Sequence, residues 1–195
     1  MLSSVETQNS NPDPVGDPDN DILPALIRQD QRAFSILVDR HIGRLSAQAA
    51  QILGDVHQAE DVTQTVFLKT WEMLPNWETG NARLLTWMRR VSKNLCLDIL
   101  RKKKPIYTDE VPDQSSDDLS AEQELTQAER NQWVRQSIQA LPERQKVALT
   151  LFYYQELSQK ACAEIMDLTV PAFESLLRRA RQTLKLTTSQ SGRLL

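Results

Sequence analysis

Residues 61–68 read Asp-Val-Thr-Gln-Thr-Val-Phe-Leu, and they precede a segment that contains Trp87 and ends in Arg-Lys-Lys-Lys at 101–104. Further along, Leu-Pro-Glu-Arg-Gln at 141–145 opens a second segment, which closes with Arg-Arg-Ala-Arg at 178–181. Both segments have helical periodicity and basic ends. Their order and spacing predict two helical modules joined by an acidic tether.

The composition favours helices over sheets. The chain has 195 residues, of which 40% are hydrophobic, and it contains 5 glycines and no long period-two run of β-branched residues. We expect an all-α fold of two small helical domains joined by a flexible acidic linker. The sequence has no long apolar stretch that would predict a membrane span, and no signal-peptide pattern, so we expect a cytoplasmic protein.

Charge is strongly segregated along the chain, although the net charge is only −3. Residues 83–104 carry eight bases and one acid, whereas residues 105–129 carry eight acids and no base. Residues 1–21 carry five acids and no base. Basic blocks at helix ends suit contact with phosphates, so the acidic overall charge is a poor guide to partners.

Turn and cap signals divide the chain into five parts. We expect a disordered acidic extension at 1–21, a helical domain at 22–104, the linker at 105–121, a second helical domain at 122–187 and a tail at 188–195. Within the domains, Asp30, Ser158 and Thr169 are predicted helix N-caps, and Pro142 suits the first turn of a helix.

The segment 158–186 has the spacing of a helix-turn-helix. A short helix containing Ala163 precedes the turn 167–169, and the next helix carries apolar and basic residues. Its second helix could enter a DNA major groove with its N-terminal side chains toward the bases. A plain helical hairpin with a solvated basic face fits the same pattern.

The basic helix at 82–104 and its preceding loop combine aromatic and basic residues. Such a combination suits stacking on unpaired bases. For Trp87 we favour a place in the core, whereas for Trp77 the residues alone leave a stacking role and a structural role equally open.

Other chemistry finds little support. Cys96, Cys162, His41 and His57 lack the spacing of metal ligands, and neither a phosphate-binding loop nor a nucleophile motif is recognisable, so we expect no metal, no cofactor and no enzymatic activity. Both cysteines sit in apolar helical patterns and are interpreted as buried small hydrophobes rather than as a redox switch.

Three motifs together resemble the extracytoplasmic-function (ECF) class of bacterial RNA polymerase sigma factors, over about residues 22–187. Residues 57–71 are similar to the core-binding segment, often Asp-Ala-Glu-Asp-Leu-Val-Gln-Glu-Val-Phe in the family. Residues 85–94, followed by Asp98 and Arg101, resemble the promoter-melting helix that reads the −10 element. Residues 141–145 and the helix-turn-helix resemble the domain that reads the −35 element.

The resemblance implies a sigma factor that binds core RNA polymerase and directs promoter recognition, DNA melting and initiation, for a stress- or signal-responsive regulon. The implied partners are the β′ clamp helices and β flap of core enzyme, promoter DNA and an anti-sigma factor.

The implied contacts with core polymerase are Asp61, Gln64, Thr65 and Leu68. The implied pocket for a flipped −10 base is Met73, Trp77, Val91 and Asn94, which turns the open question on Trp77 toward function. The implied phosphate contacts are Arg89, Arg90, Lys93, Arg101, Lys102, Lys103 and Lys104. The implied −35 contacts are Pro171, Ala172, Glu174, Ser175, Arg178 and Arg179.

The recognition helix departs from the family pattern. Where the family usually has Gly-Thr-Val-Lys-Ser-Arg, residues 171–176 read Pro-Ala-Phe-Glu-Ser-Leu. Glu174 cannot hold a phosphate but can accept a hydrogen bond from a cytosine amine, so we expect an unusual −35 sequence. Two alternatives are a polymerase-independent helix-turn-helix regulator and a helical adaptor that does not bind DNA.

Overall fold

The structure, a computed structural model, describes residues 18–78, 83–103 and 127–190, with side chains at 18–78, 83–102 and 133–186. The predicted linker 105–121 lies outside the described residues, as do most of the predicted extension and tail. Every regular element in the described part is helical, which confirms the all-α prediction. In chain order the elements are α1 (Leu23–Ile27), α2 (Gln31–Leu53), α3 (Val56–Met73), η1 (Leu74–Asn76), α4 (Leu84–Lys103), α5 (Gln127–Gln139), α6 (Glu143–Leu149), η2 (Thr150–Tyr154), α7 (Gln159–Ile165) and α8 (Val170–Gln190).

Side-chain caps fix the starts of the helices. Asp30 accepts hydrogen bonds from the amides of Arg32 and Ala33 at 2.8 and 2.9 Å and begins α2. Ser158 caps α7 and Thr169 caps α8, each through a bond to the amide three residues on. The three predicted N-caps are therefore confirmed, and each satisfies amides that have no partner within the helix.

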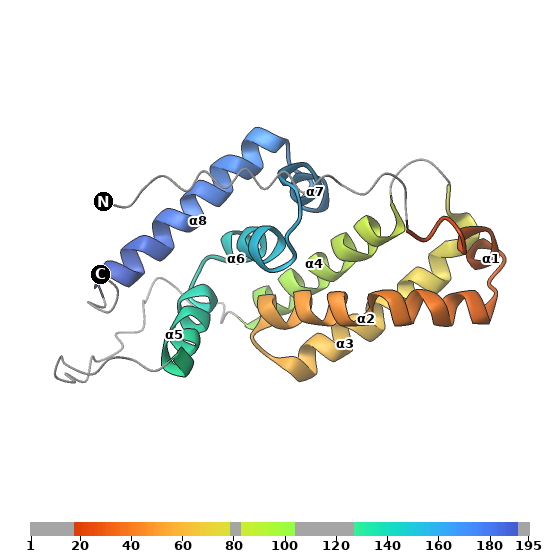
Figure 1. Cartoon of the computed structure of the whole chain (residues 1–195), viewed down its shortest axis with the longest axis horizontal. Coiled ribbons are helices and arrows are strands. Elements are labelled where there is room, and N and C mark those ends of the chain that lie inside the picture. The colour runs from red at the N-terminus through yellow and green to blue at the C-terminus, as the bar shows by residue number, and fades with distance from the viewer. Residues whose placement is uncertain (1–17, 79–82, 104–126, 191–195) are drawn as a thin grey trace.

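The first domain is a bundle of α2, α3 and α4, with α1 packed across one end (Figure 1). Its interior consists of apolar side chains spaced three or four residues apart, such as Leu37, Leu45, Val66, Leu84 and Met88, none of which is exposed to solvent. The exposed faces of α3 and α4 therefore project from a rigid core.

The second domain packs α6, η2 and α7 against the long helix α8. Phe173 and Leu177 of α8 are buried against this cluster, and the small side chain of Ala163 allows α7 to approach closely. The π-helical segment η2 continues α6 and presents Tyr153 and Tyr154 to solvent.

The two domains pack directly against each other. Helix α7 lies over α4 (Figure 1), and the buried apolar residues of the two domains form one continuous cluster. Near the end of α2, Gln139 of α5 donates a hydrogen bond of 2.8 Å to the carbonyl of Gln51. Gly54 makes room for this contact, since a Cβ there would lie 2.9 Å from the Gln139 side chain and the φ of +69° is left-handed.

The chain just before α1 is bound to α2 through hydrogen bonds and ion pairs. Asp19 is 1% exposed and lies 2.8 Å from Nε2 of His41, which is also buried. Arg40 reaches Asp19 and Asp21, and its hydrogen bond lowers the pKa of Asp21. No helix in the described part of the chain is long and apolar enough to span a bilayer.

Candidate nucleic-acid and polymerase interfaces

One face of α3 is open to solvent along the predicted polymerase-binding residues. Asp61 and Gln64 are exposed, and Leu68 is 65% exposed, although Val62 and Val66 on the other face are buried. Thr65 is half-buried and donates its hydroxyl to the carbonyl of Asp61 at 2.8 Å. The structure thus brings the four predicted residues onto one helix and leaves a large apolar side chain uncovered in their midst.

The predicted −10 pocket lies where α3 ends and α4 runs alongside. Met73, Trp77 and Val91 are half-buried against the core, whereas Asn94 is exposed. The Trp77 ring meets Trp87 edge to face, with 6.4 Å between centroids and 82° between planes. Residues 79–82 of the same loop lie outside the described part. Trp77 is therefore supported from behind by a second aromatic ring.

Three of the bases assigned to DNA phosphates contact the second domain, although the Arg90 side chain remains 38% exposed. Lys93 forms an ion pair of 3.0 Å with Asp167, in the turn between α7 and α8. Arg90 pairs with the same carboxylate at 3.2 Å and donates to the carbonyl of Glu164 at 2.8 Å. Arg89 donates to the side chain of Gln155 at 3.3 Å. In this closed arrangement these bases contact protein, not DNA.

The free end of α4 keeps its bases available. Arg101 and Lys102 are exposed, and Arg101 pairs with Asp98 one turn earlier at 3.2 Å. Exposed pairs of this kind are weak, so they do not prevent phosphate contact. The Lys103 side chain and Lys104, which were assigned the same role, lie outside the described residues.

The recognition helix presents its predicted residues at its exposed start. Pro171, Glu174, Arg178 and Arg179 are exposed, while Ala172 and Ser175 are half-buried. Between them Phe173, Leu176 and Leu177 face the core of the second domain. The turn before α8 depends on Asp167, which adopts a left-handed φ of +55° that aspartate tolerates better than most residues.

The Arg181 side chain contacts other residues of the second domain and is separate from the predicted −35 contacts of α8. Its Nε donates to the hydroxyl of Tyr153 at 2.7 Å, and its guanidinium lies 5.8 Å from the centre of the Phe152 ring. Beside it an apolar hollow of about 370 Å³ is lined by Ile138, Leu149, Tyr153, Tyr154, Arg181 and Leu184.

Sequence reasoning missed the residues that hold the domains together. The sequence places Asp167 in the turn 167–169 and gives no role to Gln155 or Gln139. No local pattern points to them, because each pairs with a residue of the other domain that is distant in the sequence. The excess of bases on α4 was the available signal, since it shows that the helix needs anionic or polar partners of some kind.

Comparisons with known proteins decide the family. The model of Sigma-70 region 2 matches residues 37–106, and that of Sigma-70, region 4 matches residues 131–184. The ECF RNA polymerase sigma factor SigM of Bacillus subtilis (strain 168) is 30% identical over 138 residues, which cover 67% of this chain and 80% of SigM. This chain belongs to the ECF sigma factors.

Other relatives agree with this assignment. The ECF sigma factor SigW of the same Bacillus strain is 29% identical to this sigma factor over 167 residues, covering 80% of this chain and 89% of SigW. The structure of CnrH, solved in complex with the cytosolic domain of CnrY, covers 88% of this chain and 97% of CnrH with a TM-score of 0.66 at 24% identity. That likeness shows a shared fold. As a sigma factor, the protein is a transcription initiation factor that binds core RNA polymerase and promoter DNA.

Proposed function

We propose that this sigma factor docks on the β′ clamp helices of core polymerase through Asp61, Gln64, Thr65 and Leu68. The exposure of Leu68 is the observation that carries the proposal, because 65% of a leucine is left in water on a helix whose other face is fully packed. Such a side chain gains free energy when a partner covers it. The flanking polar residues supply hydrogen bonds at the rim.

The −10 pocket follows from the support behind Trp77. A base flipped out of the duplex needs a rigid surface for stacking and a group that reads its edge. Trp77, held by Trp87, offers the ring, and the exposed Asn94 offers an amide with both donors and acceptors. Met73 and Val91 form the apolar sides of the pocket in this proposal.

Promoter binding requires the domains to separate. Arg101 and Lys102 can reach phosphates in the closed arrangement, whereas Arg89, Arg90 and Lys93 become available only after the contacts with Gln155, Glu164 and Asp167 break. We therefore assign them to phosphate contact in the open form, with Lys103 and Lys104 alongside. The α8 residues at 171–179 then read the −35 element, where Glu174 favours a cytosine.

The apolar hollow on the second domain suits the β flap of core polymerase. Its tyrosines, Tyr153 and Tyr154, are 48% and 42% exposed and border a mainly apolar lining whose one charged residue is Arg181. An anti-sigma factor that occupied this hollow or the α3 face would block assembly with core enzyme. We place the protein in the cytoplasm, where core polymerase works, and assign it a signal-responsive regulon.

Reconstitution with core polymerase tests the proposal. The full chain should bind core enzyme and initiate specifically from the promoter upstream of its own gene. Leu68→Gln should weaken core binding at least tenfold and reduce initiation with it, and a Leu68→Gln variant with native affinity for core enzyme would contradict the docking face. Tight binding of duplex DNA without any binding to core enzyme would instead indicate an independent helix-turn-helix regulator.

A further inference from the structure

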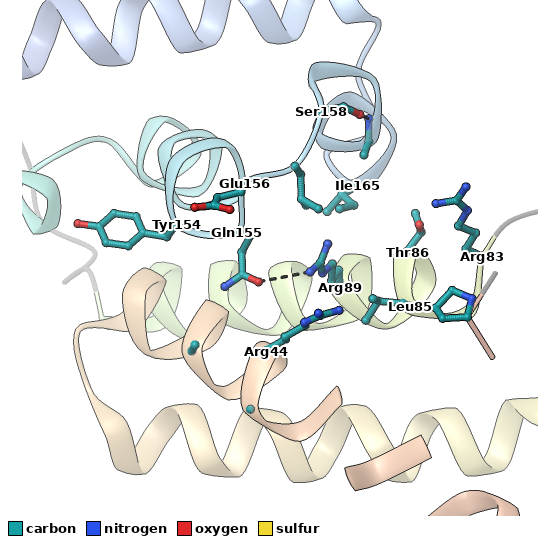
Figure 2. Close-up of a pocket in the computed structure, with 15 residues that line it drawn as sticks. Arg44, Arg83, Leu85, Thr86, Arg89, Tyr154, Gln155, Glu156, Ser158 and Ile165 are labelled. Carbon is teal, nitrogen blue, oxygen red and sulfur yellow. Dashed lines mark hydrogen bonds between the residues drawn. The ribbon is translucent and has the colours of Figure 1, made fainter. Parts of the chain in front are cut away.

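A cleft of about 730 Å³ lies between the two domains, beside the contact of α4 with α7 (Figure 2). Its walls come from α2 and α4 on one side and from residues 154–165 of the second domain on the other. Its size falls in the range of pockets that hold nucleotide-sized ligands. Both domains are needed to form it, so it exists only in the closed arrangement.

The cleft carries more positive than negative charge. Among the described residues that line it are three arginines, Arg44, Arg83 and Arg89, and one acid, Glu156. Figure 2 shows Arg44 reaching from α2 toward α4, and Arg89 directed from α4 toward Gln155. Within the part of the chain that the structure describes, neither of these two forms an ion pair with a carboxylate.

Arg89 is the most unusual of the three. It is 6% exposed, and among the described residues its buried Nε meets no hydrogen-bond partner, while its guanidinium donates a hydrogen bond to Gln155. Burial, together with the repulsion from Arg44, lowers the pKa of Arg89 to about 10. A buried guanidinium facing a like charge is unfavourable, and an anion between the two arginines would offset the cost of burial and the repulsion.

Gly43 keeps the cleft open from the α2 side. It lies in the interior of a long helix, where glycine costs about 0.5–1 kcal/mol relative to alanine. Neither the backbone nor the packing requires it, because a Cβ at this position would meet nothing within 4 Å. The missing side chain enlarges the cleft next to Arg44.

Part of the remaining wall is apolar, and the rest includes the polar residues Thr86, Gln155 and Ser158. Leu85, Leu157 and Ile165 line the cleft alongside the arginines. Guanidinium groups match phosphate oxygens in geometry as well as charge. We propose that this cleft binds a small phosphate-bearing molecule of nucleotide size, with its phosphates between Arg44 and Arg89 and its apolar or ring-shaped body against Leu85, Leu157 and Ile165.

Such a ligand would link the two domains. Since it contacts α2 and α4 as well as residues 154–165, it would stabilise the closed arrangement in which Arg90 and Lys93 are paired with Asp167. This role goes beyond promoter recognition, and the binding step needs neither polymerase nor DNA.

Thermal unfolding of the full chain tests the proposal, with ATP in EDTA, inorganic pyrophosphate and adenosine as probes. At concentrations about 100-fold above Kd, ATP should raise Tm by about 5 °C. Pyrophosphate should bind more weakly than ATP, since it lacks the body, and adenosine should give no shift. Equal shifts with ATP and pyrophosphate would refute the role of the apolar wall.

Matched variants separate this cleft from the other basic surfaces. Arg44→Gln and Gly43→Leu should each weaken ATP binding at least tenfold by calorimetry, whereas Gly43→Ala and Arg101→Gln should bind like the native chain. Melting without ligand checks that each variant is folded. The proposal is overturned if no probe shifts Tm at 10-fold higher concentrations, or if Arg101→Gln weakens binding as much as Arg44→Gln does.

Discussion

Lys93 and Asp167 stand 74 residues apart in the chain and meet in an ion pair of 3.0 Å that joins α4 to the turn of the helix-turn-helix. Lys93 is 6% exposed at its side chain, so its ammonium depends on this carboxylate. Arg90, one turn before Lys93 in α4, shares the same carboxylate. One aspartate thus holds two of the bases that were predicted to contact DNA.

Removing that charge should loosen the closed arrangement. Asp167→Asn keeps a residue that tolerates the left-handed backbone but removes the ion pairs, and we expect a loss of about 1 kcal/mol in unfolding free energy. A double-mutant cycle with Lys93→Met in urea measures the coupling. Strictly additive effects of the two substitutions would show that the pair contributes nothing to stability.

Docking on core polymerase can be tested by comparing two exposed aliphatic side chains of α3, Leu68 and Val56. Leu68→Gln should weaken core binding at least tenfold, because it removes apolar area from the proposed interface. Val56→Gln is the matched control, since Val56 is 61% exposed at the start of the same helix and outside the proposed face. Affinity for core enzyme, measured by fluorescence anisotropy, should fall for Leu68→Gln alone.

Trp77 should matter for DNA opening rather than for assembly. Trp77→Ala removes the ring proposed to stack on a flipped base, worth about 1–3 kcal/mol, and should reduce open complexes by tenfold or more. Permanganate reactivity of unpaired thymines near the −10 element measures opening. A comparable loss of core binding would reveal a structural role through the contact with Trp87.

The two arginines at 178 and 181 should behave differently although both are basic residues of α8. Arg178 is exposed, so Arg178→Gln should lower the slope of log affinity against log salt by about 1 for promoter binding by holoenzyme. Arg181→Gln should leave that slope unchanged and cost about 1 kcal/mol of stability, because it loses Tyr153 and Phe152. Titrations between 50 and 300 mM salt distinguish the two.

The thiols should resist labelling in the folded chain. Cys96 and Cys162 are fully buried, and burial raises the pKa of Cys96 to about 12. Because the thiol in the unfolded chain ionises near its ordinary value of 9.0, this group favours unfolding as pH rises from 9 toward 12. Ellman's reagent at pH 8 should react at least a hundredfold faster after unfolding. Rapid labelling of the native Cys162→Ala variant would contradict the burial of Cys96.

The sequence predicted local structure well because local structure has local causes. Asp30, Ser158 and Thr169 cap helices by bonding to amides within three residues, and a single segment shows both the cap and the helix. The burial of Cys96 and Cys162 follows from the apolar periodicity of their own helices. The ECF family was recognisable because its motifs are contiguous.

The arrangement of the domains could not be predicted in this way. The bases of α4 suit phosphates and carboxylates equally, and nothing near Lys93 in the sequence reveals that Asp167 lies opposite. Where one charge pattern fits two kinds of partner, only the folded structure shows which partner each base contacts.

The hydrogen bond from Gln139 to the end of α2 has a mechanical consequence. It attaches α5 to the first domain at a point separate from the contacts of α4 with Gln155, Glu164 and Asp167, so rotation of the second domain is restrained from both ends. If the contacts of α4 with the second domain are released together, the Gln139 contact becomes a pivot, and the second domain can rotate away from α4 while it stays bound to α2. A variant altered only at the α4 contacts should therefore open about Gln139, whereas a variant altered at Gln139 as well should allow the domains to separate.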